Sequence, residues 1–383
     1  MQNDSNSKQP TRNAKQTKLE DSSIFATRPR LAEREQMEAR AASKRSGRRW
    51  LALGALAIVI VAALLASKQS VGLGLQSSDQ FAGVAGANGA AESTPTENAL
   101  PVFTSTTEAT FTPNPTSTPL FGVGSSLIRP SDGMVMMYVP AGPFTMGTTV
   151  EEAMQECMKT RGECETAWFL DQAPAHIVQL DAYWMDQTEV TNAMYEVCVN
   201  AGVCDPPHMS NSNTVEDYFG NPAYADFPVV FITWKQAKNY CEWAGAYLPS
   251  EAQWEKAARG TDGRVFPWGN LRPTCSLANI NPFNQASCRD DVGAVRYYAD
   301  GQSPYLIYNM AGNAAEWVMD WYGENYYANS PASNPQGPDA GLAKIMRGGS
   351  WYFDEDYART TYRYKQDARY YYSFTGFRCA MSE

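Results

Sequence analysis

The sequence predicts a loop-rich α+β domain that is stapled by disulfides and preceded by one transmembrane helix. An uncharged apolar stretch covers residues 50–67. Beyond about residue 128, short segments with strand alternation mix with short helical periods and many Gly, Pro and Trp residues. All eight cysteines lie in this second part, and an even number of cysteines outside the cytoplasm is typical of disulfides.

The N-terminal region is predicted to be a cytoplasmic tail followed by a membrane anchor. Residues 1–49 carry twelve Lys or Arg against six Asp or Glu and lack hydrophobic periodicity, so we expect disorder. Residues 50–67 would span about 27 Å as a helix, close to the roughly 30 Å of a hydrocarbon core. The basic residues at 44–49 favour a single-pass protein of the cell membrane, with a cytoplasmic N-terminus and an extracytoplasmic C-terminal domain. A cleaved signal peptide is less consistent with so long a hydrophilic segment ahead of the apolar stretch.

A spacer and one large domain follow the anchor. Residues 68–127 are rich in Ser, Thr, Pro and Gly, which bury little surface, so we expect a semi-extended stalk. Residues 128–383 are long enough for one large core. Because the whole chain has a net charge of −10 and its tail is basic, the part from residue 50 onward has an excess of about sixteen negative charges. Such a surface repels nucleic acid, and we expect no nucleic-acid partner.

Local patterns predict two stretches of β-structure. Residues 134–147 are expected to form a hairpin whose strands meet at a Pro/Gly turn. Residues 176–183 alternate apolar and polar side chains like an edge strand. After residue 270 few periodicities survive, so we expect loops and short strands there.

Three helices are predicted from their N-terminal signals and periodicity. Thr191 is a suitable N-cap for a helix over residues 193–200. Apolar residues recur on one face of a second helix over residues 233–246. Ser250 and Gln253 have the capping-box spacing and start a third helix.

The cysteine spacing suggests three local disulfides and leaves two cysteines for a long-range one. Spacing alone does not fix the connectivity, because eight cysteines permit about 105 arrangements. The suggested pairs are Cys157–Cys164, Cys198–Cys204, Cys275–Cys288 and Cys241–Cys379.

Seven motifs occur in order across the domain. They are VPAGPFTMG at 139–147, EVTN at 189–192, LPSEAQWE at 248–255, FPWGN at 266–270, NMAGNAAEW at 309–317, RGGS at 347–350 and GFRC at 376–379. Together they resemble the formylglycine-generating enzyme (sulfatase-modifying factor) family. The resemblance implies a C-type-lectin-like α+β fold with bound calcium and a disulfide matching Cys241–Cys379.

The resemblance also implies where calcium would bind. Oxygen donors from a tight turn are the ligands that Ca²⁺ prefers. One site would use Asn309, Gly312, Ala314 and Glu316. A second would use Asn279 and the carbonyl of Ile280, with an acid from Asp290 or Asp291. The alternative is that these residues only cap backbone amides in turns.

The catalytic signature of the resembled oxidases is incomplete. Those enzymes bind Cu(I) through two thiols, a soft-ligand preference, and oxidise a substrate cysteine to formylglycine. Here residues 350–364 contain no cysteine, and Phe353 and Thr361 stand at the two thiol positions. Copper is therefore not expected. The iron-dependent sulfoxide synthases with this fold need several histidines, whereas this chain has only His176 and His208.

A Tyr, Trp and Arg-rich C-terminal face is the predicted ligand-binding surface, because these residues dominate binding hot spots. We interpret the chain as a non-catalytic module that binds a protein, peptide or glycan. The alternative is an active family enzyme that oxidises a sulfatase cysteine or performs a related oxidation. Trp351 and Tyr364 are expected inside and some of residues 370–372 outside. The candidate binding residues are Trp351, Tyr352, Asp354, Asp356, Tyr357, Arg359, Tyr370, Tyr371 and Tyr372.

Overall fold

The computed structural model describes residues 121–383. The predicted tail, the transmembrane anchor and nearly all of the stalk lie outside these residues, and no helix within them is long and apolar enough to cross a membrane. Phe121 packs against Tyr138 and Trp184, with ring centroids 5.6 and 5.0 Å away. The folded unit therefore begins before the predicted boundary at residue 128.

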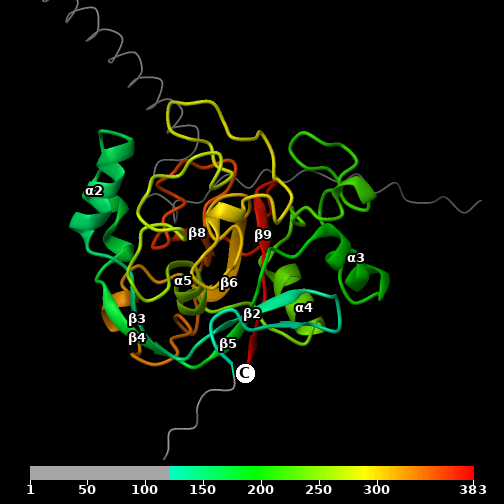
Figure 1. Cartoon of the computed structure of the whole chain (residues 1–383), viewed down its shortest axis with the longest axis horizontal. Helices are drawn as coiled ribbons and strands as arrows, with labels where there is room; N and C mark the ends of the chain where they lie inside the picture. The colour runs from blue at the N-terminus through cyan, green and yellow to red at the C-terminus, as the bar shows by residue number, and fades with distance from the viewer. Residues whose placement is uncertain (1–120) are drawn as a thin grey trace, which may run out of the picture. The chain divides into compact units, whose positions relative to one another are not determined.

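Ten short strands in the described part of the chain form three small sheets (Figure 1). They are β1 (Ser126–Ile128), β2 (Val135–Val139), β3 (Gly142–Met146), β4 (His176–Leu180), β5 (Tyr183–Asp186), β6 (Ala315–Trp321), β7 (Lys344–Arg347), β8 (Tyr364–Gln366), β9 (Thr375–Phe377) and β10 (Ala380–Ser382). The first sheet has the order β1-β2-β5-β10, the second pairs β3 with β4, and the third has the order β8-β7-β6-β9. Each pairing is antiparallel except that of β6 with β9.

The α-helices of the described region all begin at a hydroxyl N-cap. The three predicted helices are confirmed, including the capping box of Ser250 with Gln253. A fourth helix was not predicted, because only Ala153 and Cys157 of its side chains are buried and its apolar face is short. In Figure 1 this helix, α2, lies at one side of the domain and α3 at the other. The helices are α2 (Val150–Thr160), α3 (Asn192–Asn200), α4 (Trp234–Trp243) and α5 (Glu251–Arg259).

The predicted hairpin over residues 134–147 is wrong. Its two strands, β2 and β3, belong to different sheets: β2 pairs with β1 and β5, and β3 pairs with β4. Pro140 lacks an N–H for a ladder, and Gly142 has φ +129°, so the chain leaves the first sheet there instead of turning back. The predicted strand over residues 176–183 likewise divides into β4 and β5, which lie in different sheets.

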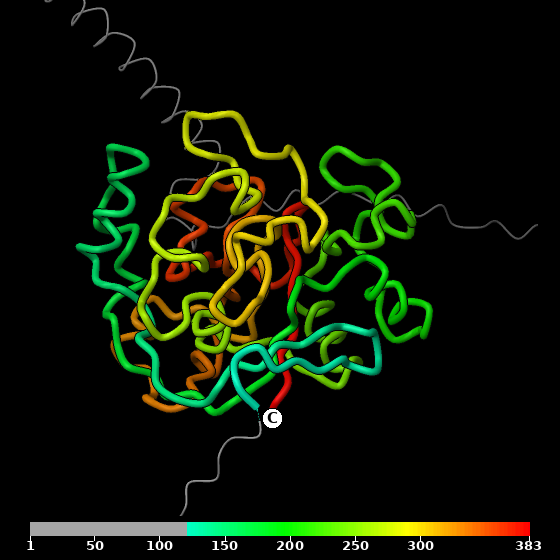
Figure 2. Tube along the Cα trace, viewed as in Figure 1, coloured from blue at the N-terminus to red at the C-terminus, as the bar shows by residue number. Residues whose placement is uncertain are grey.

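Two tryptophans lie at the centre of the domain. Trp254 of α5 and Trp317 of β6 have no exposed surface. Their indole N–H groups are satisfied, since Trp254 donates to Glu316 at 2.7 Å and Trp317 to the carbonyl of Ile232 at 2.9 Å. The chain between α5 and β6 winds over the domain as loops, drawn mainly in yellow in Figure 2.

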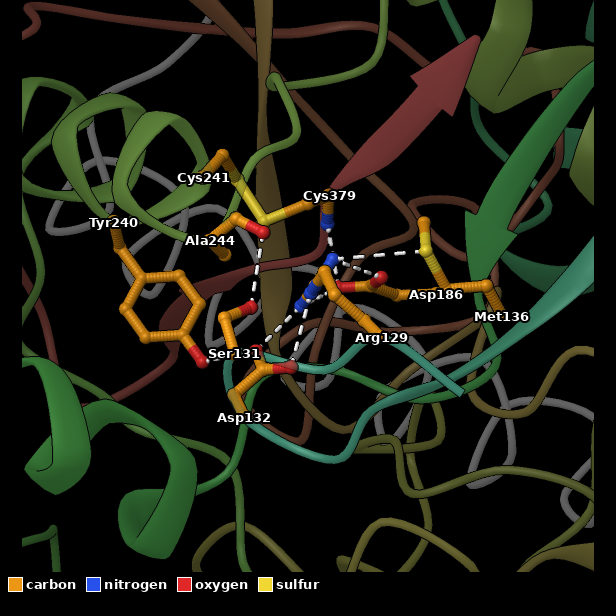
Figure 3. Close-up of a disulfide and its surroundings, with 9 residues drawn as sticks. All are labelled: Arg129, Ser131, Asp132, Met136, Asp186, Tyr240, Cys241, Ala244 and Cys379. Carbon is orange, nitrogen blue, oxygen red and sulfur yellow. Dashed lines mark hydrogen bonds and ion pairs between the residues drawn. A yellow bond between two sulfur atoms is a disulfide. The ribbon is translucent and has the colours of Figure 1, made fainter. Parts of the chain in front are cut away.

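All four suggested disulfides are confirmed. The long-range bridge joins α4 to the residue before β10 across a sequence separation of 138 residues. A buried charge cluster lies beside it (Figure 3): Arg129 contacts Asp186 at 2.7 Å and Asp132 at 2.6 Å. The backbone N–H of Cys379 donates to the same Asp186 at 2.9 Å. Burial raises the pKa of Asp186 to about 6, although the Arg129 charge opposes this shift.

Candidate functional site

The first position at which the sequence resemblance led us to expect a thiol holds an aromatic ring. Phe353 is buried, with 4% of its surface exposed. It stacks on Tyr357 at 4.5 Å and contacts Tyr364 and Phe374 at 5.3 and 5.1 Å between ring centroids. A phenyl ring offers no donor atom to a metal ion.

The second position at which the resemblance led us to expect a thiol is Thr361, whose hydroxyl is hydrogen-bonded by neighbouring side chains. Arg359 donates through Nη1 to Thr361 Oγ1 at 3.1 Å and to Gln172 Oε1 at 2.9 Å. Its Nε donates to Asp356 at 2.9 Å, which fixes the guanidinium. Gln172 ends the short 3-10 turn Leu170–Gln172 and has no exposed surface. An arginine and an amide therefore fill the space around Thr361.

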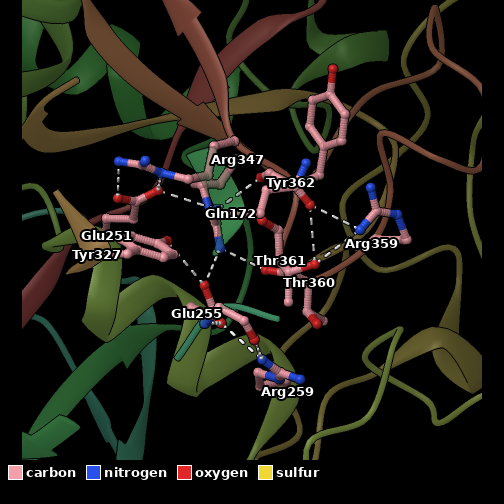
Figure 4. A network of polar contacts seen from close by, with 12 residues as sticks. Gln172, Glu251, Glu255, Arg259, Tyr327, Arg347, Arg359, Thr360, Thr361 and Tyr362 are labelled. Carbon is pink, nitrogen blue, oxygen red and sulfur yellow. Dashed lines mark hydrogen bonds and ion pairs between the residues drawn. The ribbon is translucent and has the colours of Figure 1, made fainter. Parts of the chain in front are cut away.

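A buried ionic network contacts the backbone of this segment (Figure 4). Arg347 at the end of β7 donates to Glu255 at 2.6 Å and to Glu251 at 3.2 Å. Both acids come from the same face of α5, because residues four apart are one turn apart. The guanidinium also donates to the carbonyls of Thr360 and Tyr362 at 2.6 and 2.8 Å. One arginine thus anchors the backbone on both sides of residue 361.

A second arginine completes the network. Arg363 contacts the two oxygens of Glu251 at 2.8 and 2.9 Å and donates to the carbonyl of Asp171 at 2.7 Å. Neither Arg363 nor Glu251 is exposed by more than 1%. Charges buried so deeply are tolerated because each is paired and hydrogen-bonded.

The predicted ligand-binding residues divide between interior and surface. Trp351 is buried, as expected, and its indole N–H donates to the carbonyl of Ser373 at 3.3 Å. Tyr364 is half-buried, which differs from the fully interior position expected. Tyr370 and Tyr371 are 42% and 37% exposed.

The charged residues among these candidates are interior. Asp354, Asp356 and Arg359 are buried, and the two acids form ion pairs with Arg161 and Arg359 respectively. These three residues lie beneath the predicted ligand-binding surface and are not part of it. The remaining candidates, Tyr352, Tyr357 and Tyr372, are half-buried.

A small cleft lies beside the same loop and borders α2. Its lining includes Arg272, Glu355 and Arg359. Its charges are largely paired, since Arg272 contacts Glu355 at 3.2 Å. This cleft is polar and nearly filled by its own ion pairs.

The first set of predicted calcium ligands does not fit a calcium ion in this arrangement. Both oxygens of Glu316 are taken by Arg378 at 2.7 Å, and one also accepts the indole N–H of Trp254. The Asn309 amide donates to Glu189 at 3.0 Å. A guanidinium already supplies the positive charge that the Glu316 carboxylate needs.

The second predicted set retains an unsatisfied oxygen. Asn279 is fully buried, and its Oδ1 has no hydrogen-bond partner among the described residues. The carbonyl of Ile280 accepts from Cys288 N–H at 3.1 Å and keeps a second lone pair. Asp291 is engaged by the hydroxyls of Ser212 and Thr214.

The structure brings the two predicted sets into contact. A Cβ on Gly312 would lie 2.4 Å from the carbonyl oxygen of Asn279, so only glycine allows this approach. Asn313 links the sets, because its Oδ1 accepts from Asn279 at 3.1 Å and its Nδ2 donates to Glu189 at 2.8 Å. Burial raises the pKa of Glu189 to about 7, and the like charge of Glu316 adds to this shift, whereas the positive charge of Arg378 opposes it.

Glu189 was not predicted as part of a site. The available signal was that Glu189 lies in the same motif as the helix N-cap Thr191. An acid at such a place is equally consistent with a solvent-exposed charge. Among residues 121–383, no three His, Cys, Asp or Glu side chains cluster closely enough to hold a metal ion by themselves. All eight cysteines are in disulfides.

The fold and the order of the motifs are those of a mixed α and β domain of the formylglycine-generating type. Residues 127–383 match the sulfatase-modifying factor enzyme 1-like domain family, and the chain belongs to it. The resemblance seen in the sequence is thereby confirmed.

Individual relatives agree with this assignment. The chain is 31% identical over 301 residues to the formylglycine-generating enzyme of Bos taurus, covering 66% of this chain and 76% of the relative. It is 30% identical over 286 residues to that of Streptomyces coelicolor, covering 63% and 85%. The solved structure of PvdO from Pseudomonas aeruginosa superposes with a TM-score of 0.55 at 22% identity, covering 69% of this chain and all of that one, which is a likeness of fold alone.

Proposed function

We propose that this chain is a membrane-anchored, extracytoplasmic member of the family that binds a ligand and does not oxidise cysteine. The observation that carries the proposal is the chemistry at the two thiol positions. Phe353 is enclosed by aromatic rings, and Thr361 is held by Arg359 and Gln172.

The state of the cysteines supports the part of the proposal that excludes copper. Cu(I) prefers soft thiolate ligands, and only a deprotonated thiol can bind it in this way. Each cysteine of the chain is already consumed in a disulfide. A displaced pair of thiols elsewhere in the sequence is therefore not available without reduction of a disulfide.

The binding face is the tyrosine-rich surface above this filled site. Tyr352, Tyr357 and Tyr372 are half-buried, and Tyr370 and Tyr371 are more exposed. Tyrosine buries much area at low entropic cost and keeps a polar tip, which suits recognition of a protein, peptide or glycan. The rigid network under residues 360–362 would hold this face in one conformation.

The test is turnover by the full-length chain with its disulfides intact. The protein is loaded with Cu(I) and incubated under oxygen with a Cys-x-Pro-x-Arg peptide, and mass spectrometry follows conversion of cysteine to formylglycine. We expect no conversion while an active family oxidase converts the peptide. Conversion would contradict the proposal and support the alternative, an active enzyme, which the identity to the bovine enzyme favours.

We also propose that calcium binds at Asn279. The buried, unpartnered Oδ1 of Asn279 and the carbonyl of Ile280 support this, because both are hard oxygen donors. Calcium added to chelator-treated protein should raise its melting temperature, and the Asn279→Ala variant should lose this increase. An equal calcium response in wild type and variant would contradict the assignment.

A further inference from the structure

The loop at residues 367–372 presents aromatic rings that are held in place from behind. Tyr370 stacks on Tyr372 with an interplanar angle of 2° and centroids 6.0 Å apart. Tyr372 stacks on Phe374 at 4.8 Å and 5°, and Phe374 stacks on Tyr352 at 5.4 Å and 14°. The four rings form a row in which Phe374 is buried, Tyr352 and Tyr372 are half-buried and Tyr370 is the exposed end.

A second stacked pair lies on the same loop. Tyr371 and the exposed His208 are parallel, with centroids 4.1 Å apart and an interplanar angle of 3°. Phe231 contacts Tyr371 edge-on at 6.4 Å. Its φ of +58° is unusual for a bulky residue, and backbone hydrogen bonds to Tyr372 and from His208 hold it there.

The polar rim of this loop carries no unpaired charge. Arg369 contacts both oxygens of Asp367, at 3.0 Å through Nε and 2.6 Å through Nη2. The Asp367 carboxylate also accepts the backbone N–H of Arg369 at 2.9 Å, which closes the turn. The pair leaves the loop with no net charge from these two residues, and a neutral polyhydroxyl ligand can hydrogen-bond to its outer edges.

We propose that this loop is a platform for a neutral glycan, an inference that rests on the proposed binding function and names its ligand class. A sugar ring would lay its apolar C–H face on Tyr370 and Tyr371 and direct hydroxyls to the Asp367–Arg369 pair. Two features favour a glycan over a peptide. The rings offer flat, pre-ordered faces, and the two charged residues of the loop, Asp367 and Arg369, pair with each other.

The test is affinity electrophoresis of the full-length chain through gels that contain a soluble β-glucan, mannan or glycol chitin. We expect the wild type to be retarded in at least one gel. The double variant Tyr370→Ala/Tyr371→Ala should bind the same polysaccharide at least about tenfold more weakly. Tyr297→Ala is the matched control, because Tyr297 is a 60% exposed tyrosine in another loop. It should be retarded like the wild type.

The outcomes separate this inference from the proposed function. Unchanged migration in all three gels, or equal retardation of the double variant, would overturn the glycan platform. Capture of a peptide or protein that the double variant loses would also overturn it, while leaving a binding function intact. Conversion of the cysteine peptide in the copper assay would instead overturn the proposed function itself.

Discussion

Replacement of Arg347 by methionine should destabilise the domain strongly. The variant keeps most of the side-chain volume but removes the guanidinium, so Glu251 and Glu255 each lose a buried positive partner. The carbonyls of Thr360 and Tyr362 lose their donor as well. Breaking one partner of a buried ion pair costs about 3–5 kcal/mol.

The size of this effect decides how it should be measured. A loss of 3–5 kcal/mol is a large share of the roughly 5–15 kcal/mol by which domains are stable. With a urea dependence of about 3 kcal/mol/M, the unfolding midpoint of Arg347→Met should fall by about 1 M or more. Urea titration followed by tryptophan fluorescence, with the disulfides intact, measures this shift.

A surface ion pair supplies the matched control. Lys238 and Glu242 form a pair one turn apart on α4, with side chains 31% and 53% exposed. Lys238→Met should cost less than about 0.5 kcal/mol, because water screens such pairs. If Arg347→Met lay within about 1 kcal/mol of the wild type, the buried network would not be what holds residues 360–362.

Two further predictions concern the long-range disulfide and a buried acid. The double variant Cys241→Ser/Cys379→Ser should lose about 2–5 kcal/mol of unfolding free energy. Its melting temperature should be lower than that of the Cys157→Ser/Cys164→Ser variant, because the long-range disulfide closes a loop of 138 residues and the local one a loop of 7. Equal losses in the two variants would contradict this. Burial, with the nearby charge of Glu251, raises the pKa of Asp320 to about 7, so the folded state binds its proton more tightly than the unfolded state. The free energy of unfolding of the wild type should therefore fall as pH rises from about 4 to about 7. The unfolding free energy of Asp320→Asn relative to that of the wild type should increase over the same range in denaturant titrations. A difference that does not change with pH would refute the assignment.

Features set by local chemistry could be predicted from the sequence. The predicted N-caps at Thr191 and Ser250 depend on contacts within four residues, and all three predicted helices begin within one residue of the expected position. The three local disulfides followed from short spacing, and the fourth from the cysteines that remained. The motifs gave the family because they occur in order along the whole domain.

Features that depend on distant partners could not be predicted. The pairing of β2 with β5 joins residues almost fifty positions apart, so the close spacing of β2 and β3 suggested a false hairpin. Arg347 and Glu255 read as ordinary charges until the fold placed them 2.6 Å apart. Asp354, Asp356 and Arg359 likewise suggested a polar surface, whereas their ion pairs allow them to be buried.

The central claim is that the family's copper site has no ligands here, and a Cu(I) competition titration tests it most directly. The full-length chain, kept free of oxygen, competes with a chromophoric Cu(I) chelator whose absorbance reports the metal it holds. We expect the chelator to keep its copper, because Phe353 and Thr361 supply no thiolate and every cysteine is in a disulfide. Transfer of one Cu(I) per chain to the protein, with all four disulfides intact, would contradict the account.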